Sequence, residues 1–247
     1  AGVDCSDHEV NIKILLDAAV ADGDLTEKQR NALLVEMTDE VSGLVLRDNY
    51  LQTQAITLIA AEGPGSLDNQ IRLMRTLERQ GHLNRAVEFL PDDEGLAERS
   101  AARQGLARPE IAVLFSHCKI WLYEQVIGSD LPDDSHLAID AVRYFPTPIQ
   151  SKLKPRIVGH RLRREIVATS ITNSLINRVG GTFVTEILEK TGMPVVDIAR
   201  AYIVARDVFS VRSIWDRIEA LDNVVPATVQ ITLHRDVQRL VERATMW

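Results

Sequence analysis

The chain has 247 residues, 45% of them hydrophobic, so it is long enough to bury a core of its own. Its formal net charge of −7 argues against nucleic acid or an anionic membrane as a partner. Cys5 and Cys118 are too few for a disulfide framework, and no apolar run reaches the ~20 residues of a membrane span. These features predict a cytoplasmic protein.

The first third of the chain shows the apolar spacing of helices. Ser6 and Glu9 form a capping-box pattern, which predicts a helix beginning at Ser6. Thr26 and Gln29 repeat this pattern ahead of a long helical stretch. That stretch is expected to end at the glycine- and proline-rich residues 63–65, because glycine and proline stop helices.

The rest of the chain continues the helical pattern. Pro109 suits the first turn of a helix, whereas the prolines at 146, 148 and 155 are expected to break the stretch that holds them. Further helices are expected at about 160–179, 181–191, 195–208, 210–221 and 226–245. No strand alternation or βαβ pattern occurs. The sequence therefore predicts an all-α fold of roughly ten to twelve helices, with no parallel sheet and no Rossmann unit.

Motifs for metals and phosphates are missing. No His, Cys or Glu spacing is typical of a zinc or di-iron site, and the glycines at 63–65 and 180–181 lack the dinucleotide and P-loop patterns. We therefore expect no metal site and no cofactor site in this chain. Residues 5–9 are rich in nucleophiles and acids, but consecutive side chains fan out around a turn and do not converge as a triad does. No catalytic residue is expected.

The segment 160–179 is apolar on two sides, which predicts a buried helix. Thr169 and Asn173 fall inside one of the two apolar arcs and need hydrogen-bond partners if they are buried. They mark either a polar site or domain contact, or core groups paired within the fold. The second interpretation is favoured, because buried polar groups are generally paired.

A basic cluster stands where this segment begins. It consists of Lys154, Arg156, His160, Arg161, Arg163 and Arg164. The cluster fits an anionic ligand or an acidic partner surface, but a solvated face with an Arg161–Glu165 pair is favoured over both. The candidate interdomain or anion contacts are thus His160, Arg161, Arg164, Thr169 and Asn173.

The opening run Gly2-Val3-x-x-Ser6-x-x-Glu9 resembles a motif of glutamate dehydrogenases, which follows their nucleotide-binding domain. The stretches "VDCSDHEVNIKILL", "RPEIAVLFSHCKIWL", "HRLRREIVATSITNSLINRVGGTFV" and "RATMW" resemble the C-terminal part of the large bacterial NAD-dependent members. Several of these stretches are long and distinctive, and together with shorter ones they spread the resemblance over most of the chain.

This resemblance implies a parent enzyme that oxidatively deaminates glutamate to 2-oxoglutarate and ammonia with NAD. It also implies that Ser6 contacts the side-chain carboxylate of the substrate; a plain N-cap is the other interpretation of Ser6. The family's Asn-Ala-Gly-Gly lead-in is missing, and the catalytic Lys and Asp would lie upstream. We therefore expect residues 1–12 to be the tail of the upstream catalytic domain. Residues 13–247 are expected to be a helical C-terminal domain, with a subdomain seam near 90–108.

The fragment alone is expected to be inactive and not to bind NAD. Its expected role is structural or regulatory, through packing on the upstream catalytic domain and on other subunits of a homo-oligomer. A free-standing all-helical interaction module without a catalytic parent is the alternative. An allosteric amino-acid site in the helical domain is a third interpretation.

Overall fold

The computed structural model describes the backbone of residues 2–247 and the side chains of residues 7–247. Over this range the chain forms thirteen α-helices and three short 3-10 helices without any strand, which confirms the all-α class. The chain divides into two compact units, one of Ala1–Gln52 and Ser129–Ser170, the other of Thr53–Gly128 and Ile171–Trp247. Two long helices, α2 (Glu27–Glu62) and α9 (Arg163–Val179), contribute residues to both units.

The first unit combines the two N-terminal helices with a group of short ones. Besides the first part of α2 and the start of α9, it holds α1 (Gly2–Ala21), the 3-10 helices Leu131–Asp133 and Ser135–Leu137, α6 (Ala138–Tyr144), α7 (Thr147–Lys152) and α8 (Lys154–Val158). The prolines at 146, 148 and 155 break this stretch as expected, and they stand at the starts of the separate short helices α7 and α8. Proline is tolerated there, because the first helical N–H groups have no partner within the helix.

The two capping-box predictions have different outcomes. Helix α1 begins at Gly2, so the prediction of a helix start at Ser6 is wrong. A capping box is a local preference of about 1 kcal/mol, and it does not end a helix that already continues through it. The second prediction is confirmed. The Thr26 N–H donates to Oε1 of Gln29 at 2.8 Å, the Gln29 N–H donates to Oγ1 of Thr26 at 3.3 Å, and α2 begins at Glu27.

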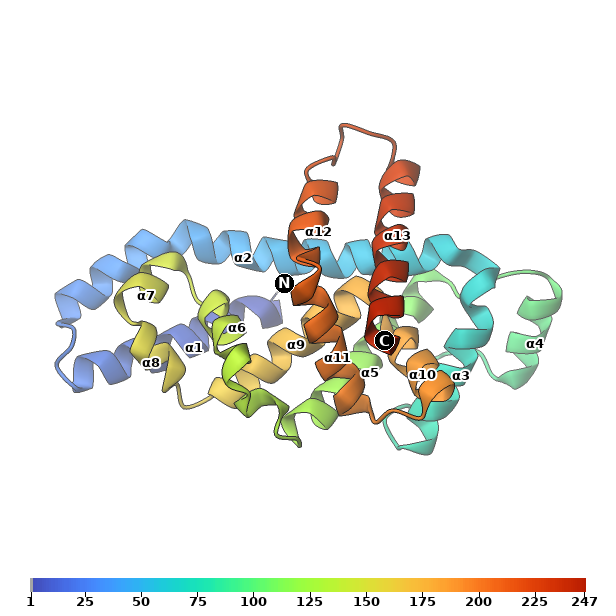
Figure 1. The fold of residues 1–247 in the computed structure, drawn as a ribbon, viewed down its shortest axis with the longest axis horizontal. Helices are drawn as coiled ribbons and strands as arrows, with labels where there is room; N and C mark the ends of the chain where they lie inside the picture. The colour runs from blue at the N-terminus through green and yellow to red at the C-terminus, as the bar shows by residue number, and fades with distance from the viewer. Residues whose placement is uncertain (1) are drawn as a thin grey trace. The chain divides into compact units, whose positions relative to one another are not determined.

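The second unit holds the larger core. Besides the end of α2 and of α9, it contains the 3-10 helix Gly63–Ser66, α3 (Leu67–Arg79), α4 (Asp93–Ala101), α5 (Arg108–Ile127), α10 (Gly181–Thr191), α11 (Val195–Val208), α12 (Val211–Glu219) and α13 (Ala227–Met246). Helices α3, α5, α10 and α11 pack on one another, and α13 lies against α11 and α12 (Figure 1). The expected helices of this region match the observed bounds to within three residues.

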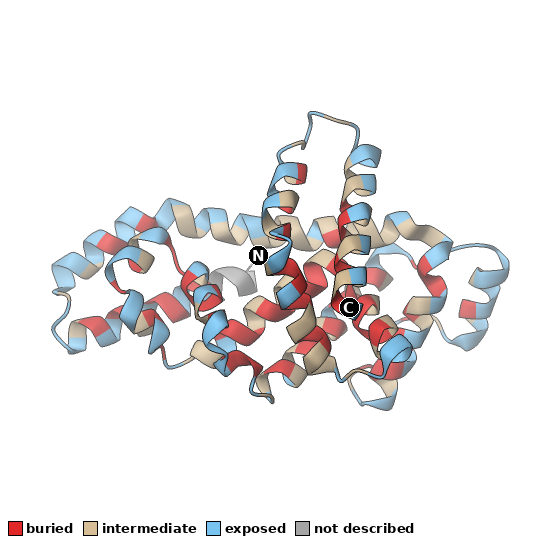
Figure 2. Cartoon of the chain, viewed as in Figure 1, coloured by how far each residue is buried: buried red, intermediate tan, exposed pale blue. Residues whose placement is uncertain are grey.

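The centre of the second unit is closely packed. Trp121 of α5 and Tyr202 of α11 are fully buried, whereas most of the loop from α12 to α13 is exposed (Figure 2). A Cβ atom on Gly181 would lie 2.3 Å from Sγ of Cys118, so only glycine lets α10 approach α5 this closely. The preceding Gly180 has φ +81° and separates α9 from α10, as the glycine pair predicts.

Helix α9 is buried on both of its apolar arcs, as predicted. Val167, Ile171 and Leu175 of one arc are fully buried, and Ile166 and Ile176 of the other are at most 3% exposed. Across the described helices, none is long and apolar enough to cross a membrane.

Candidate functional site

The predicted substrate contact, Ser6, has its side chain outside the described residues. The next turn of its helix is described in full, and it belongs to a polar cluster in the first unit. We call this cluster the α1 anchor: Asp7, His8, Asn11, Tyr144 and His160. These side chains come from α1, from the end of α6 and from the turn before α9.

Tyr144 ties α6 to α1 through two hydrogen bonds. Its hydroxyl donates to Oδ2 of Asp7 at 2.9 Å and accepts from Nδ2 of Asn11 at 2.9 Å. The same Nδ2 of Asn11 also donates to Oδ1 of Asp7 at 3.1 Å, which closes the triangle. Burial is the main reason that the pKa of Tyr144 is raised, so the hydroxyl keeps the proton that it donates to Asp7.

His160 adds a second tie to the same helix. Its Nε2 donates to the backbone carbonyl of Asn11 at 3.1 Å, and its Nδ1 accepts from the Leu162 N–H at 3.0 Å. These two bonds require a neutral ring with the proton on Nε2. Burial lowers the pKa of His160 and favours that neutral form. Both nitrogens are therefore occupied inside the unit, and the ring offers no positive charge to an anion.

His8 completes the α1 anchor. Its ring stacks on that of Tyr144, with centroids 4.5 Å apart and planes at 22°. Its Nε2 lies 3.8 Å from Oδ2 of Asp48 on α2. The Nδ1 atom is buried and has no hydrogen-bond partner among the described side chains. An unpaired buried ring nitrogen carries a cost of about 1–3 kcal/mol, which a bound water would remove.

Half of the predicted basic cluster, namely Arg156, His160 and Arg164, is paired within its own unit. Arg164 forms an ion pair with Asp133 and donates from Nη2 to the Ser129 carbonyl at 2.9 Å. Arg156 pairs with Asp22 at 2.8 Å and also with Asp24. These two arginines are therefore not free to bind an anion.

Arg161 is the exception among the candidate cations. Its side chain is exposed, and the described residues show no ion pair between it and Glu165, although the i,i+4 spacing allows one. It is thus left for solvent or for a partner.

The two polar residues expected inside α9 are only half-buried, and no hydrogen bond is recorded for Thr169 or Asn173. The polar side chains that α9 does bury are Thr172 and Asn177, each 3% exposed. Their Oγ1 and Oδ1 atoms have no partner among the described residues. The helical wheel did not predict which polar residues of α9 are buried. It gives the angle of each residue around the helix axis, but not how closely the neighbouring helices cover that side.

Tyr144 and Asp48 were not among the residues expected from the sequence. No local signal identifies them, because Tyr144 meets Asp7 across 137 residues of chain.

Fold and site together define an all-α chain whose first helix is held by a partly buried polar anchor. A family model described as glutamate dehydrogenase, C-terminal, matches residues 103–247. A second, described as bacterial NAD-glutamate dehydrogenase, catalytic domain, matches residues 1–59. The chain belongs to the glutamate dehydrogenase family, as its C-terminal portion. The division predicted at residue 12 stays a prediction.

Relatives with curated names agree. The chain is 51% identical over 246 residues to the NAD-specific glutamate dehydrogenase of Pseudomonas aeruginosa and 48% identical over 246 residues to that of Halomonas elongata. It is 40% identical over 247 residues to that of Mycobacterium tuberculosis. Each match covers the whole chain but only 15% of the relative. The resemblance inferred from the motifs is thereby confirmed.

Proposed function

We propose that the chain is the C-terminal part of an enzyme that oxidatively deaminates L-glutamate to 2-oxoglutarate and ammonia, with NAD as the hydride acceptor. The observation that carries this proposal is the match of residues 1–59 to the catalytic-domain model, together with relatives named NAD-specific glutamate dehydrogenase. NAD and the catalytic Lys and Asp are assigned to the rest of the enzyme, because the chain has no dinucleotide motif. We place the enzyme in the cytoplasm.

The proposed role of Ser6 is to donate a hydrogen bond to the side-chain carboxylate of glutamate. Ser6 directly precedes Asp7 on a continuous helix, so the position of its backbone follows from that of the next turn. The α1 anchor holds this turn through Asp7 and Asn11. Tyr144 is therefore proposed as a positioning residue for substrate binding, and this gives the helical chain a structural role in catalysis.

The proposed partners of the chain are its own upstream catalytic domain and other subunits of a homo-oligomer. One feature of the first unit supports a partner there: the exposed cation of Arg161, which has no ion pair among the described residues.

The full-length enzyme and the 247-residue chain should be compared for glutamate-dependent NADH formation. The full-length enzyme should reduce NAD only when glutamate is present, and the chain alone should neither turn over nor bind NAD. Turnover by the chain alone would contradict the assignment of the catalytic groups to the rest of the enzyme.

A further inference from the structure

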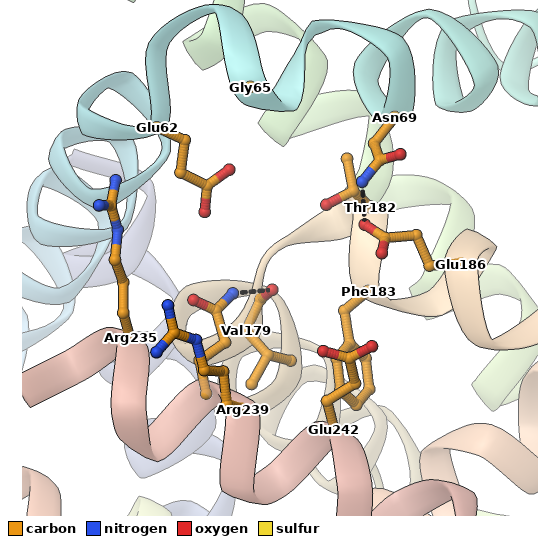
Figure 3. Close-up of a pocket in the computed structure, with 11 residues that line it drawn as sticks. Glu62, Gly65, Asn69, Val179, Thr182, Phe183, Glu186, Arg235, Arg239 and Glu242 are labelled. Carbon is orange, nitrogen blue, oxygen red and sulfur yellow. Dashed lines mark hydrogen bonds between the residues drawn. The ribbon is translucent and has the colours of Figure 1, made fainter. Parts of the chain in front are cut away.

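A polar cavity of about 370 Å³ lies in the second unit, outside the α1 anchor (Figure 3). Helices α10 and α13 and the turn from α2 into α3 form its walls. Its volume falls in the range of small-molecule sites, roughly 300–1,000 Å³. The charged side chains that line it are Glu62, Glu186, Arg235, Arg239 and Glu242.

Two of the three carboxylates already have partners. Glu186 accepts a hydrogen bond from Nδ2 of Asn69 at 2.6 Å, and Oε1 of Glu242 lies 2.7 Å from Nζ of Lys190. The same ammonium lies 3.7 Å from Oε2 of Glu186, so it links the two carboxylates. This side of the cavity is largely satisfied by the chain itself.

The third carboxylate and a neighbouring guanidinium lack an ion-pair partner in the described part of the chain, although Glu62 has a hydrogen bond with the Ser66 side chain. Among the described residues, neither Glu62 nor Arg235 forms an ion pair within 4.0 Å, and Nη2 of Arg235 is buried without a hydrogen-bond partner. The Glu62 carboxylate points into the cavity, and the guanidinium groups of Arg235 and Arg239 lie on the same side of it (Figure 3). Burial raises the pKa of Glu62, while the charge of Arg235 lowers it. A donor without a hydrogen-bond partner and a carboxylate without a counter-charge within 4.0 Å thus face one cavity.

The mixture of charges limits what can bind. A simple anion would meet the three carboxylates Glu62, Glu186 and Glu242, and a simple cation would meet Arg235 and Arg239. A molecule with one charge of each sign avoids both repulsions and supplies both missing partners, since Arg235 is a donor and ionised Glu62 an acceptor.

We propose that this cavity binds a small zwitterion carrying a carboxylate and a protonated amine, the chemistry of a free amino acid. The ligand carboxylate accepts from Nη2 of Arg235, with Arg239 beside it, and the ligand ammonium donates to Glu62. The rest of the ligand lies against Val179 and Phe183, the apolar part of the lining.

Binding should be measured by calorimetric titration of the full-length protein with each of the twenty free L-amino acids. At least one amino acid other than glutamate is expected to bind saturably; glutamate is set apart because the proposed catalytic centre also binds it. For the tightest binder, the decarboxylated amine and the 2-hydroxy acid analogue should each bind at least 10-fold more weakly, because each lacks one of the two charges. This comparison needs no variant, so it remains valid if a substitution disturbs folding.

Variants then locate the site. Arg235→Gln and Glu62→Gln should each weaken binding at least 10-fold. Arg243→Gln should leave it unchanged, because Arg243 is exposed on the same helix and does not line the cavity. Glutamate bound at the catalytic centre should be insensitive to all three variants, which separates the two sites.

The proposal is overturned if no amino acid other than glutamate binds saturably, or if that binding survives both Arg235→Gln and Glu62→Gln. Neither result depends on a measurement of glutamate turnover. The binding proposal and the proposed enzymatic function can therefore be tested separately.

Discussion

The guanidinium carbon of Arg178 lies 4.7 Å from the centre of the Trp215 ring, and the same guanidinium forms an ion pair with Glu219. Both charged side chains are only 8% exposed. The contacts join the end of α9 to α12 inside the second unit. The contacts with the ring and the carboxylate offset the free-energy cost of burying the guanidinium charge. Removing one of these partners leaves that cost uncompensated.

Glu219→Ala is therefore expected to lower the free energy of unfolding by about 3–5 kcal/mol, because a buried guanidinium loses its counter-charge. Urea denaturation followed by circular dichroism measures the change. Glu36→Ala is the matched control, since Glu36 pairs with Lys152 at 3.0 Å on the surface and both are about half exposed. It should cost less than about 1 kcal/mol. Equal losses in the two variants would contradict the importance of burial.

Gly181→Ala is expected to destabilise the chain by about 1–3 kcal/mol, because the new methyl would overlap with Cys118. Adding Cys118→Ala removes the sulfur atom that lies 2.3 Å from the new Cβ. The double variant should then lose less stability than the two single variants lose together, because the side chains at positions 118 and 181 compete for the same volume. Thermal unfolding of all four proteins completes this cycle, and strict additivity would show that the close approach of α10 to α5 is not what Gly181 provides.

Tyr144→Phe removes the hydroxyl that binds Asp7 and Asn11 but keeps the ring that stacks on His8. Stability should fall by about 1–2 kcal/mol from the lost hydrogen bonds. In the full-length enzyme, KM for glutamate should rise several-fold with a smaller change in kcat, because the altered contact orients α1 and does not touch the reacting atoms. Tyr123→Phe, on α5 of the second unit, is the control for losing a tyrosine hydroxyl elsewhere. An unchanged KM in Tyr144→Phe would refute the positioning role.

His160 makes stability depend on pH. Its pKa is lowered in the folded chain, so between that value and about 6.5 the unfolded chain binds more protons than the folded one. The free energy of unfolding should therefore fall as the pH drops below about 6.5, with a slope from this group of at most ~1.4 kcal/mol per pH unit.

His160→Gln should reduce that slope, whereas His136→Gln, at an exposed position, should not. Some slope should remain in His160→Gln, because burial also lowers the pKa of His234. Denaturation curves recorded at pH 7 and at pH 5 test this, and an unaltered slope in His160→Gln would show that the neutral ring is not required.

The sequence alone determined the all-α class, the family resemblance and most helix boundaries in the second unit. Apolar spacing, the Thr26–Gln29 capping box and the glycines at 63–65 and 180–181 are local signals, and they act within a few residues of the bond that they predict. The failure at Ser6 has the same origin, because a cap preference is local and weak while helix propagation is cooperative.

Only the tertiary structure decided which polar side chains are paired within the chain and which are left without a partner. His160 and Arg164 were candidates for anion binding, and only their contacts with Asn11 and Asp133 show that they are satisfied within the unit. Glu62 and Arg235 carried no signal in the sequence, because 173 residues separate them and only the packing of α13 brings them to one cavity. Hydrogen bonds and ion pairs depend on distances in space. The spacing of residues in the sequence predicts such distances within one helix, but not between helices.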